Sequence, residues 1–167
     1  MSFKLTWKSH IICFLITIGI VLIMNSIIDN ILINYIQIFI SSDNLMVKIF
    51  ISIIFLMIPI SIVHEEIHGV AYKLFGGKIK YGFKGIYAYT METSGKEILR
   101  VKFLIVLLAP LATMSVLSLF LPSWLGGMIF LLNLLGASGD IYMSLFLCKF
   151  NCDSKITDRI YGFDVTG

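Results

Sequence analysis

Charged side chains are scarce in this sequence, in which Asp, Glu, Lys and Arg make up 14% of 167 residues. Soluble globular domains carry about 25% charged residues, whereas here 58% of the residues are hydrophobic and the mean hydropathy is +0.94. These values exclude a soluble globular domain and predict an all-α polytopic membrane protein. The length allows about four spanning helices of ~20 residues each, in one domain without a separate soluble module.

Cysteine motifs, targeting segments and repeats are also missing. Cys13, Cys148 and Cys152 have neither the spacing of a zinc knuckle nor that of a redox pair, so we expect three reduced thiols. The first apolar run has full spanning length and no small-residue cleavage site, which indicates an anchor rather than a cleavable signal peptide. No repeats or low-complexity tracts occur in the chain.

Four apolar segments are candidates for spanning helices. The first reads as an anchor, and the third is interrupted by Pro110 and enriched in small residues that favour close helix packing. The fourth begins at Trp124, a residue typical of a membrane interface. The segments are residues 11–28, residues 49–63 with a continuation to about residue 73, residues 101–121 and residues 124–147.

The connections between these segments differ in composition. Residues 29–44 are amphipathic, so we expect them to lie at the outer interface without crossing. Residues 76–100 combine five cations with glycine-punctuated β-prone stretches, which predicts a small β-hairpin at the membrane surface. We therefore expect an N-terminal anchor and external segment over residues 1–48, a membrane core over residues 49–147, and a short polar tail over residues 148–167.

The distribution of cations predicts the orientation. With four spans and the N-terminus inside, 12 of the 13 Lys and Arg residues face the cytosol, and Lys48 is the exception. Both termini and the β-hairpin are therefore expected on the cytosolic side of the cell membrane, in a multi-pass protein. The basic hairpin fits an ordinary cytosolic loop, so we expect no nucleic-acid partner.

A His-Glu-x-x-His sequence ends the second apolar run. His64 and His68 are four residues apart, so on a helix their imidazoles project from one face and can bind one ion. Glu65 can reach a water at that metal and act as a general base, whereas Glu66 points elsewhere. The alternative is a chance group of polar residues near the membrane surface. Their burial beside hydrocarbon is costly without a metal, which favours the metal site.

Two histidines leave a third zinc ligand to be found, because a catalytic zinc usually takes three protein ligands. His64 lies roughly 22 Å down the second span from Ile49, and Asp140 lies roughly 24 Å down the fourth from Trp124, in the same direction. This shared depth makes Asp140 the candidate ligand. The alternative for Asp140 is a side chain that reaches water near a helix end.

Three further residues are candidates for substrate contact. Asn133 lies two helical turns before Asp140 on the expected fourth span, about 10 Å deeper, and could hold substrate backbone or bond across helices. The stretch 85–93 is β-prone, so its edge could pair with an unwound substrate. Tyr87 and Tyr89 lie in that stretch. The alternative for this stretch is a surface loop without a role.

Several motifs together resemble a known family. They are H-E-E-I-H at residues 64–68, a glycine-bearing hairpin, L-L-A-P-L at residues 107–111 and N-L-L-G-A-S-G-D at residues 133–140. The chain resembles the bacterial putative zincin peptidases, relatives of the site-2 protease class of intramembrane metalloproteases, over roughly residues 49–147. The resemblance implies that His64, His68 and Asp140 bind Zn2+ and that Glu65 is the catalytic base.

The expected function is that of a membrane-embedded zinc metallopeptidase that hydrolyses peptide bonds near the cytosolic face. Its partners would be the lipid bilayer and a peptide or membrane-protein substrate, and the oligomeric state stays open. The alternative is a non-catalytic membrane protein with a structural or sensing metal site in a larger complex. Glu65 discriminates the two, because a structural site needs no base. A metal transporter is disfavoured, since one ligand cluster occurs without a ladder of polar residues.

Overall fold

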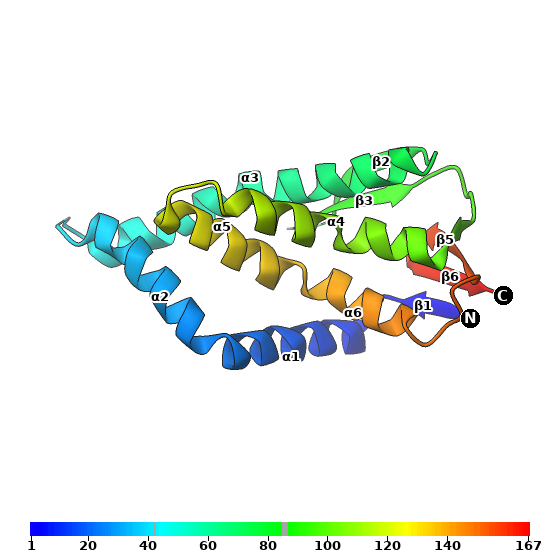
Figure 1. The fold of residues 1–167 in the computed structure, drawn as a ribbon, viewed down its shortest axis with the longest axis horizontal. Coiled ribbons are helices and arrows are strands. Elements are labelled where there is room, and N and C mark those ends of the chain that lie inside the picture. The colour runs from blue at the N-terminus through cyan, green and yellow to red at the C-terminus, as the bar shows by residue number, and fades with distance from the viewer. Residues whose placement is uncertain (42, 85–86) are drawn as a thin grey trace.

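The computed structural model describes residues 1–41, 43–84 and 87–167, and most of them are helical (Figure 1). Helices and small antiparallel sheets alternate along the chain, with the sheets gathered at the end where both termini lie. The helices are α1 Trp7–Ile23, α2 Asn25–Ile36, η1 Gln37–Phe39, α3 Leu45–Leu74, α4 Arg100–Ser118, α5 Ser123–Gly136 and α6 Ser138–Leu147. The strands are β1 Ser2–Lys4, β2 Ile79–Lys84, β3 Tyr87–Glu92, β4 Ile98–Leu99, β5 Lys155–Arg159 and β6 Gly162–Thr166.

Within the described residues, two helices are long and apolar enough to cross a membrane, namely α3 and α4. Two bent pairs bring the number to as many as four if each pair is one span: α1 with residues 25–39, bent by 82°, and α5 with α6, bent by 50°. The expected first span over residues 11–28 is therefore divided, because α1 ends at Ile23 and α2 begins at Asn25. The expected continuous fourth span is likewise two helices.

The expectation of an all-α protein with one hairpin is incomplete. The predicted hairpin exists as β2 and β3, but the tail, expected to be short and polar, forms β5 and β6. These strands join a four-stranded antiparallel sheet in the order β1-β6-β5-β4. Phe163 on β6 stacks on Phe3 of β1 at 4.9 Å and meets Phe103 of α4 edge-on at 5.2 Å. Aromatic burial therefore attaches the sheet to the helices.

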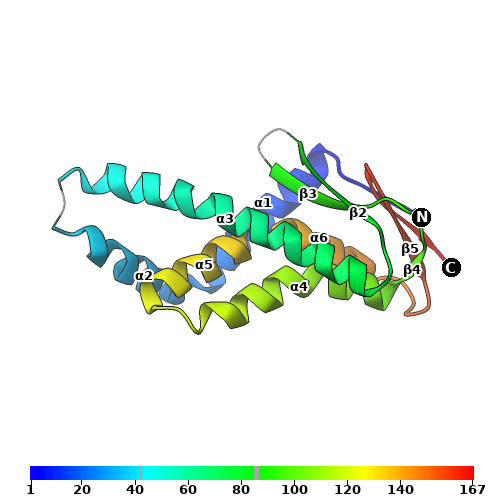
Figure 2. The same cartoon turned by 90° about the horizontal axis from the view of Figure 1, so that it is seen from above.

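Helix α3 ends through a glycine cap. Gly76 has φ +78, a conformation that favours glycine, and its N–H donates to the Lys73 carbonyl while the Gly77 N–H donates to the Tyr72 carbonyl. The chain then reverses, so that β2 and β3 return along the C-terminal half of α3 (Figure 2). The hairpin consequently lies beside the turn of α3 that carries His64 and His68.

Specific contacts attach the hairpin to α3. The Tyr81 hydroxyl donates to the Glu66 carboxylate at 2.9 Å, and the Thr90 hydroxyl donates to the Glu65 carbonyl at 2.9 Å. Gly69 permits the close approach, because a Cβ there would lie 2.2 Å from the Tyr81 hydroxyl oxygen. These bonds fix the position of β3 against the helix.

Asp158 joins three elements at the sheet end of the molecule. One oxygen of its carboxylate accepts hydrogen bonds from the Tyr72 hydroxyl of α3 and from the Glu92 N–H of β3, both at 2.9 Å, while Asp158 itself belongs to β5. Burial raises the pKa of Asp158 from its ordinary value of 3.8 to about 6, against the effect of the two donors. The neighbouring Glu92 carboxylate adds to this shift.

The raised pKa of Asp158 predicts a pH-dependent stability. The folded protein binds this proton more tightly than the unfolded chain does, so protonated Asp158 contributes to the free energy of unfolding. This contribution is fully present below about pH 4 and is lost as the pH rises through about 6. The difference amounts to about 3 kcal/mol at most. We expect the free energy of unfolding of the wild-type protein in detergent to fall over this window, and Asp158→Asn to remove the fall while keeping an oxygen acceptor.

A matched control is Asp153→Asn, because Asp153 is exposed and precedes the same strand. This variant should keep the wild-type decrease between pH 4 and 7. An Asp158→Asn protein whose unfolding free energy still falls as steeply as that of the wild type would contradict the assignment of the titration to Asp158.

Candidate metal centre

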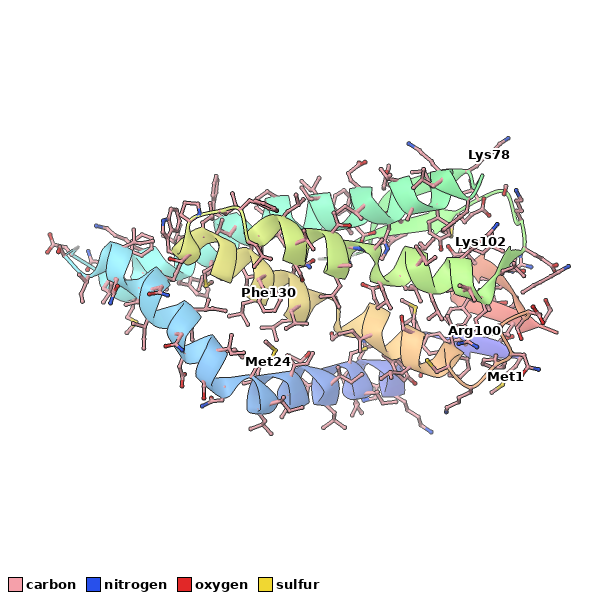
Figure 3. The ribbon with its side chains drawn as sticks, viewed as in Figure 1. Met1, Met24, Lys78, Arg100, Lys102 and Phe130 are labelled. Carbon is pink, nitrogen blue, oxygen red and sulfur yellow. The ribbon has the colours of Figure 1, made fainter. Side chains whose placement is uncertain are left out.

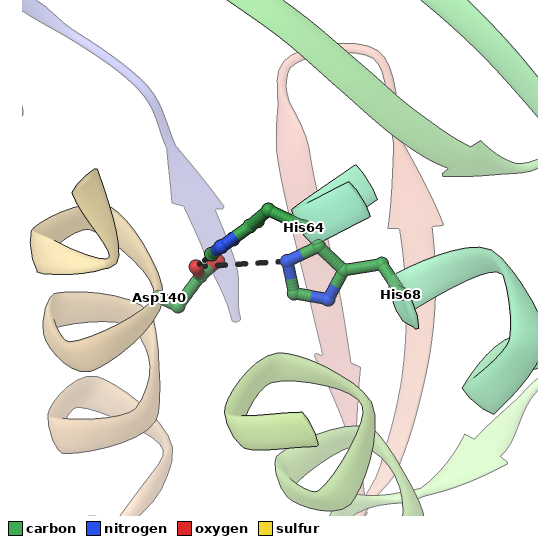
Figure 4. A group of neighbouring side chains, drawn as sticks. All are labelled: His64, His68 and Asp140. Carbon is green, nitrogen blue, oxygen red and sulfur yellow. Dashed lines mark hydrogen bonds and ion pairs between the residues drawn. The ribbon is translucent and has the colours of Figure 1, made fainter. Parts of the chain in front are cut away.

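The C-terminal part of α3 places His64 and His68 on one face of the helix. The two residues are one turn apart, both are buried, and their ring centroids are separated by 4.8 Å. Figure 4 shows that both imidazoles turn toward the carboxylate of Asp140, which comes from α6. Residues far apart in the sequence therefore meet at one point.

Asp140 lies in the first turn of α6, and its Oδ2 atom contacts both histidines. This oxygen is 3.1 Å from Nε2 of His64 and 3.6 Å from Nε2 of His68. Two ligand atoms of a tetrahedral zinc, each at about 2.1 Å from the metal, are about 3.4 Å apart. The separations of 3.1 and 3.6 Å are close to that value, and the three potential ligand atoms all lie within 4.8 Å of one another.

The opposite ring nitrogens of the histidines are held by oxygen acceptors. Nδ1 of His68 lies 2.8 Å from the Val106 carbonyl, and Nδ1 of His64 lies 2.8 Å from Oδ1 of Asn133. The amide of Asn133 is oriented by its Nδ2 group, which donates to the Pro110 carbonyl at 3.4 Å. Since these oxygens only accept, each Nδ1 must carry a hydrogen, so Nε2, which faces Asp140, is the nitrogen of each ring that is available to a metal.

Three electron-pair donors therefore converge in a buried space. Two imidazole nitrogens and one carboxylate oxygen grouped in this way can coordinate one cation. Two histidines and one carboxylate also form the ligand set of catalytic zinc sites that keep one position for water or substrate. The residues present thus fit a zinc ion in both chemistry and spacing.

A family model described as putative zincin peptidase matches residues 57–154, which is more than half of the chain. The chain belongs to this zincin peptidase family. The matched region contains His64, His68 and Asp140, and membership of the family together with this cluster indicates zinc as the metal. No curated protein and no solved structure matches the chain.

The two acids of the zincin peptidase motif have different surroundings. Glu66 is exposed, and its carboxylate accepts the hydrogen bond from Tyr81. Glu65 is partly buried and close enough to His64 and His68 to interact with both electrostatically. Glu66 is therefore engaged with the hairpin, and Glu65 is the acid beside the cluster.

Asn133 lies on a different helix from Asp140. The sequence placed it about 10 Å deeper than Asp140 on one continuous helix, but α5 and α6 are separate helices that meet at 50°. The Asn133 side chain is 1% exposed and bonds to His64 and Pro110. In this zincin peptidase family member it makes the bonds across helices that were the alternative for this residue, and a contact with substrate stays a prediction.

The structure does not bring Tyr89 to the cluster. Tyr81 and Thr90 form a cross-strand pair whose side chains face α3, and the alternation of strand residues puts Tyr89 on the opposite face. There its ring lies over Gly82. Tyr87 belongs to β3 by its backbone. Gly85 and Ile86 of the predicted substrate stretch lie outside the described residues.

Sequence reasoning missed two contributors to the centre. Val106 supplies a backbone carbonyl, and an apolar side chain gives no sign of that function. Pro110 was noted only as an interruption of a spanning segment. Its place four residues after Val106 was the available signal, because proline leaves the carbonyl four residues earlier without its helical N–H partner.

Proposed function

We propose that this zincin peptidase family member is a membrane-embedded zinc metallopeptidase. The observation that carries the proposal is the convergence of Nε2 of His64, Nε2 of His68 and Oδ2 of Asp140 beside Glu65. Three ligands and an adjacent acid are the components that a hydrolytic zinc site requires. A structural zinc site would instead take four protein ligands, and three are found among the described residues.

Each residue has a separate role in the proposed reaction. His64, His68 and Asp140 hold the metal, which supplies Lewis-acid chemistry by polarising a carbonyl and making water more acidic. Glu65 takes a proton from the attacking water and then delivers it to the amine that leaves. The Nδ1 hydrogen bonds of the histidines keep both Nε2 atoms directed at the metal.

The membrane location is part of the proposal. Lys78, Arg100 and Lys102 lie at the end of the molecule that carries Met1 and the sheets (Figure 3). This distribution supports a multi-pass protein of the cell membrane with that end, and both termini, in the cytosol. Peptide bonds would then be cut near the cytosolic face, in peptides or membrane proteins, as in the site-2 protease class.

The register of the hairpin identifies how an extended substrate would pair with it. The Thr93 N–H donates to the Lys78 carbonyl, whereas the Glu92 N–H points away from β2 toward Asp158. Since N–H groups alternate in direction along a strand, those of Ala88 and Thr90 also point outward. The backbone N–H groups of Tyr87 and Tyr89 face β2, so these two residues are not the ones that would donate hydrogen bonds to a substrate strand.

We therefore expect Ala88→Pro to slow the cleavage of a membrane-peptide reporter by about threefold to tenfold, because it removes one outward donor. Zinc content should not change. Ala88→Ser, which keeps the N–H, is the matched control and should cut at the wild-type rate. Equal rates for Ala88→Pro and the wild type would show that substrate does not add to this edge.

Replacing Glu65 by Gln tests the function itself. A peptidase loses hydrolysis and keeps its zinc, since Gln has a similar shape but cannot take up the proton. A site with a purely structural or sensing role keeps its properties in the same variant.

A further inference from the structure

Pro110 lies inside α4 and is fully buried. In an α-helix the N–H of residue 110 would donate to the carbonyl of Val106, but proline has no N–H. That carbonyl instead accepts the Nδ1 hydrogen of His68 at 2.8 Å. The missing helical bond of α4 is thus replaced by a bond to the proposed metal ligand on α3.

The second histidine is connected to the same residue through a backbone carbonyl, which alanine would also supply. The Pro110 carbonyl accepts from Nδ2 of Asn133 at 3.4 Å, which leaves Oδ1 of Asn133 directed at Nδ1 of His64 at 2.8 Å. Without that bond the two ends of the Asn133 amide could exchange places, and an NH2 group would then face the imidazole. Position 110 is therefore connected to both histidines, but only the bond to His68 depends on the missing N–H of proline.

We propose that Pro110 is a positioning residue that keeps a hydrogen on Nδ1 of His68, so that Nε2 of His68 is left for the metal. The inference rests on the proposed zinc site and adds a residue that does not touch the metal. It requires that the lack of an N–H at position 110, rather than a bend in the helix, is what matters.

Pro59 provides the matched control for this distinction. It is also a proline in the interior of a helix, but on the exposed surface of α3, more than one turn before His64. Substitution of either proline by alanine restores a helical N–H. Only at position 110 does that N–H compete with a histidine for its carbonyl.

The experiment compares Pro110→Ala and Pro59→Ala in the full-length protein in detergent, with zinc affinity measured by competition against a chromophoric chelator. We expect Pro110→Ala to weaken zinc binding about 10- to 100-fold, the usual effect of losing a partner of a metal-ligating histidine. Pro59→Ala should bind within about twofold of the wild type. Equal affinity of Pro110→Ala and the wild type would overturn the inference.

A second measurement observes the ring nitrogens directly. In protein labelled with 15N at histidine, the ring nitrogen signals of His64 and His68, assigned by single substitutions, report which nitrogen carries hydrogen. We expect a hydrogen on Nδ1 of both in the wild type, with and without zinc, and a reduced fraction at His68 alone in Pro110→Ala. A wild-type protein with bare Nδ1 nitrogens would overturn the inference.

Failure of the inference and failure of the proposed function give different results. A protein that binds zinc with the expected dependence on Pro110, yet hydrolyses no peptide after full zinc loading, refutes the peptidase and leaves the inference intact. The opposite result is also possible. If the wild type hydrolyses its reporter, and the Pro110→Ala variant keeps both its zinc affinity and its Nδ1 hydrogen, the inference alone is refuted.

Discussion

A Glu65→Gln protein is expected to bind as much zinc as the wild type and to cleave a membrane-peptide reporter at least about a hundredfold more slowly. Glu65 is the acid beside the histidines, while Glu66 is engaged with Tyr81. Glutamine keeps the shape and hydrogen-bonding capacity of the side chain but cannot take a proton from water at neutral pH. The effect should therefore fall on the rate of hydrolysis and not on the metal.

The matched control is Glu66→Gln, which makes the same change one residue away. Since the carboxylate of Glu66 accepts from Tyr81 on the outside of the helix, this variant should keep most of the activity. Reporter cleavage in proteoliposomes and zinc by elemental analysis are the two measurements. Undiminished cleavage by Glu65→Gln would refute the peptidase function, and loss of zinc in that variant would identify Glu65 as a ligand.

A His68→Ala protein is expected to lose its zinc. Nε2 of His68 lies 3.6 Å from Oδ2 of Asp140 and is one of three converging ligand atoms, so its removal leaves two protein ligands. Catalytic zinc sites usually need three. We expect the zinc content to fall from about one per chain to a small fraction after dialysis, and hydrolysis to disappear with it.

The chain supplies its own control for this experiment. His10, the remaining histidine of three, is exposed in α1, away from the cluster. His10→Ala should keep the full zinc content, and this comparison removes nonspecific binding to histidine as an explanation. If His68→Ala retains zinc as firmly as His10→Ala does, the metal is held elsewhere and the assigned centre is wrong.

The meeting of the three predicted ligands could be anticipated because it depends on quantities that the sequence contains. Helical spacing places His64 and His68 on one face, and the rise per residue gives the depth of each residue in a span. Depth brought Asp140 level with His64, and the structure has the two side chains in contact. The break between α5 and α6 does not disturb this agreement in depth, because Asp140 directly follows the break.

The bonds around the ligands could not be anticipated in the same way. The position of Asn133 depends on the angle at the break of the fourth apolar segment, and the partner of His68 is a backbone atom of another helix. Both depend on tertiary packing. The four-stranded sheet was missed for a similar reason, since β1 has three residues and β4 has two, too few for a periodic pattern.

The sheet has a consequence for the order of folding. The ammonium group of Met1 donates to the Val165 carbonyl at 2.7 Å across 164 positions of sequence, and β5 and β6 follow every helix in the chain. Contacts of such separation close late and slowly, because the loop between them must first be ordered. The helices and the hairpin can assemble before this closure. Asp158 on β5 then reaches Tyr72, one turn beyond His68, so this bond to α3 forms only after β5 has joined the assembled helices.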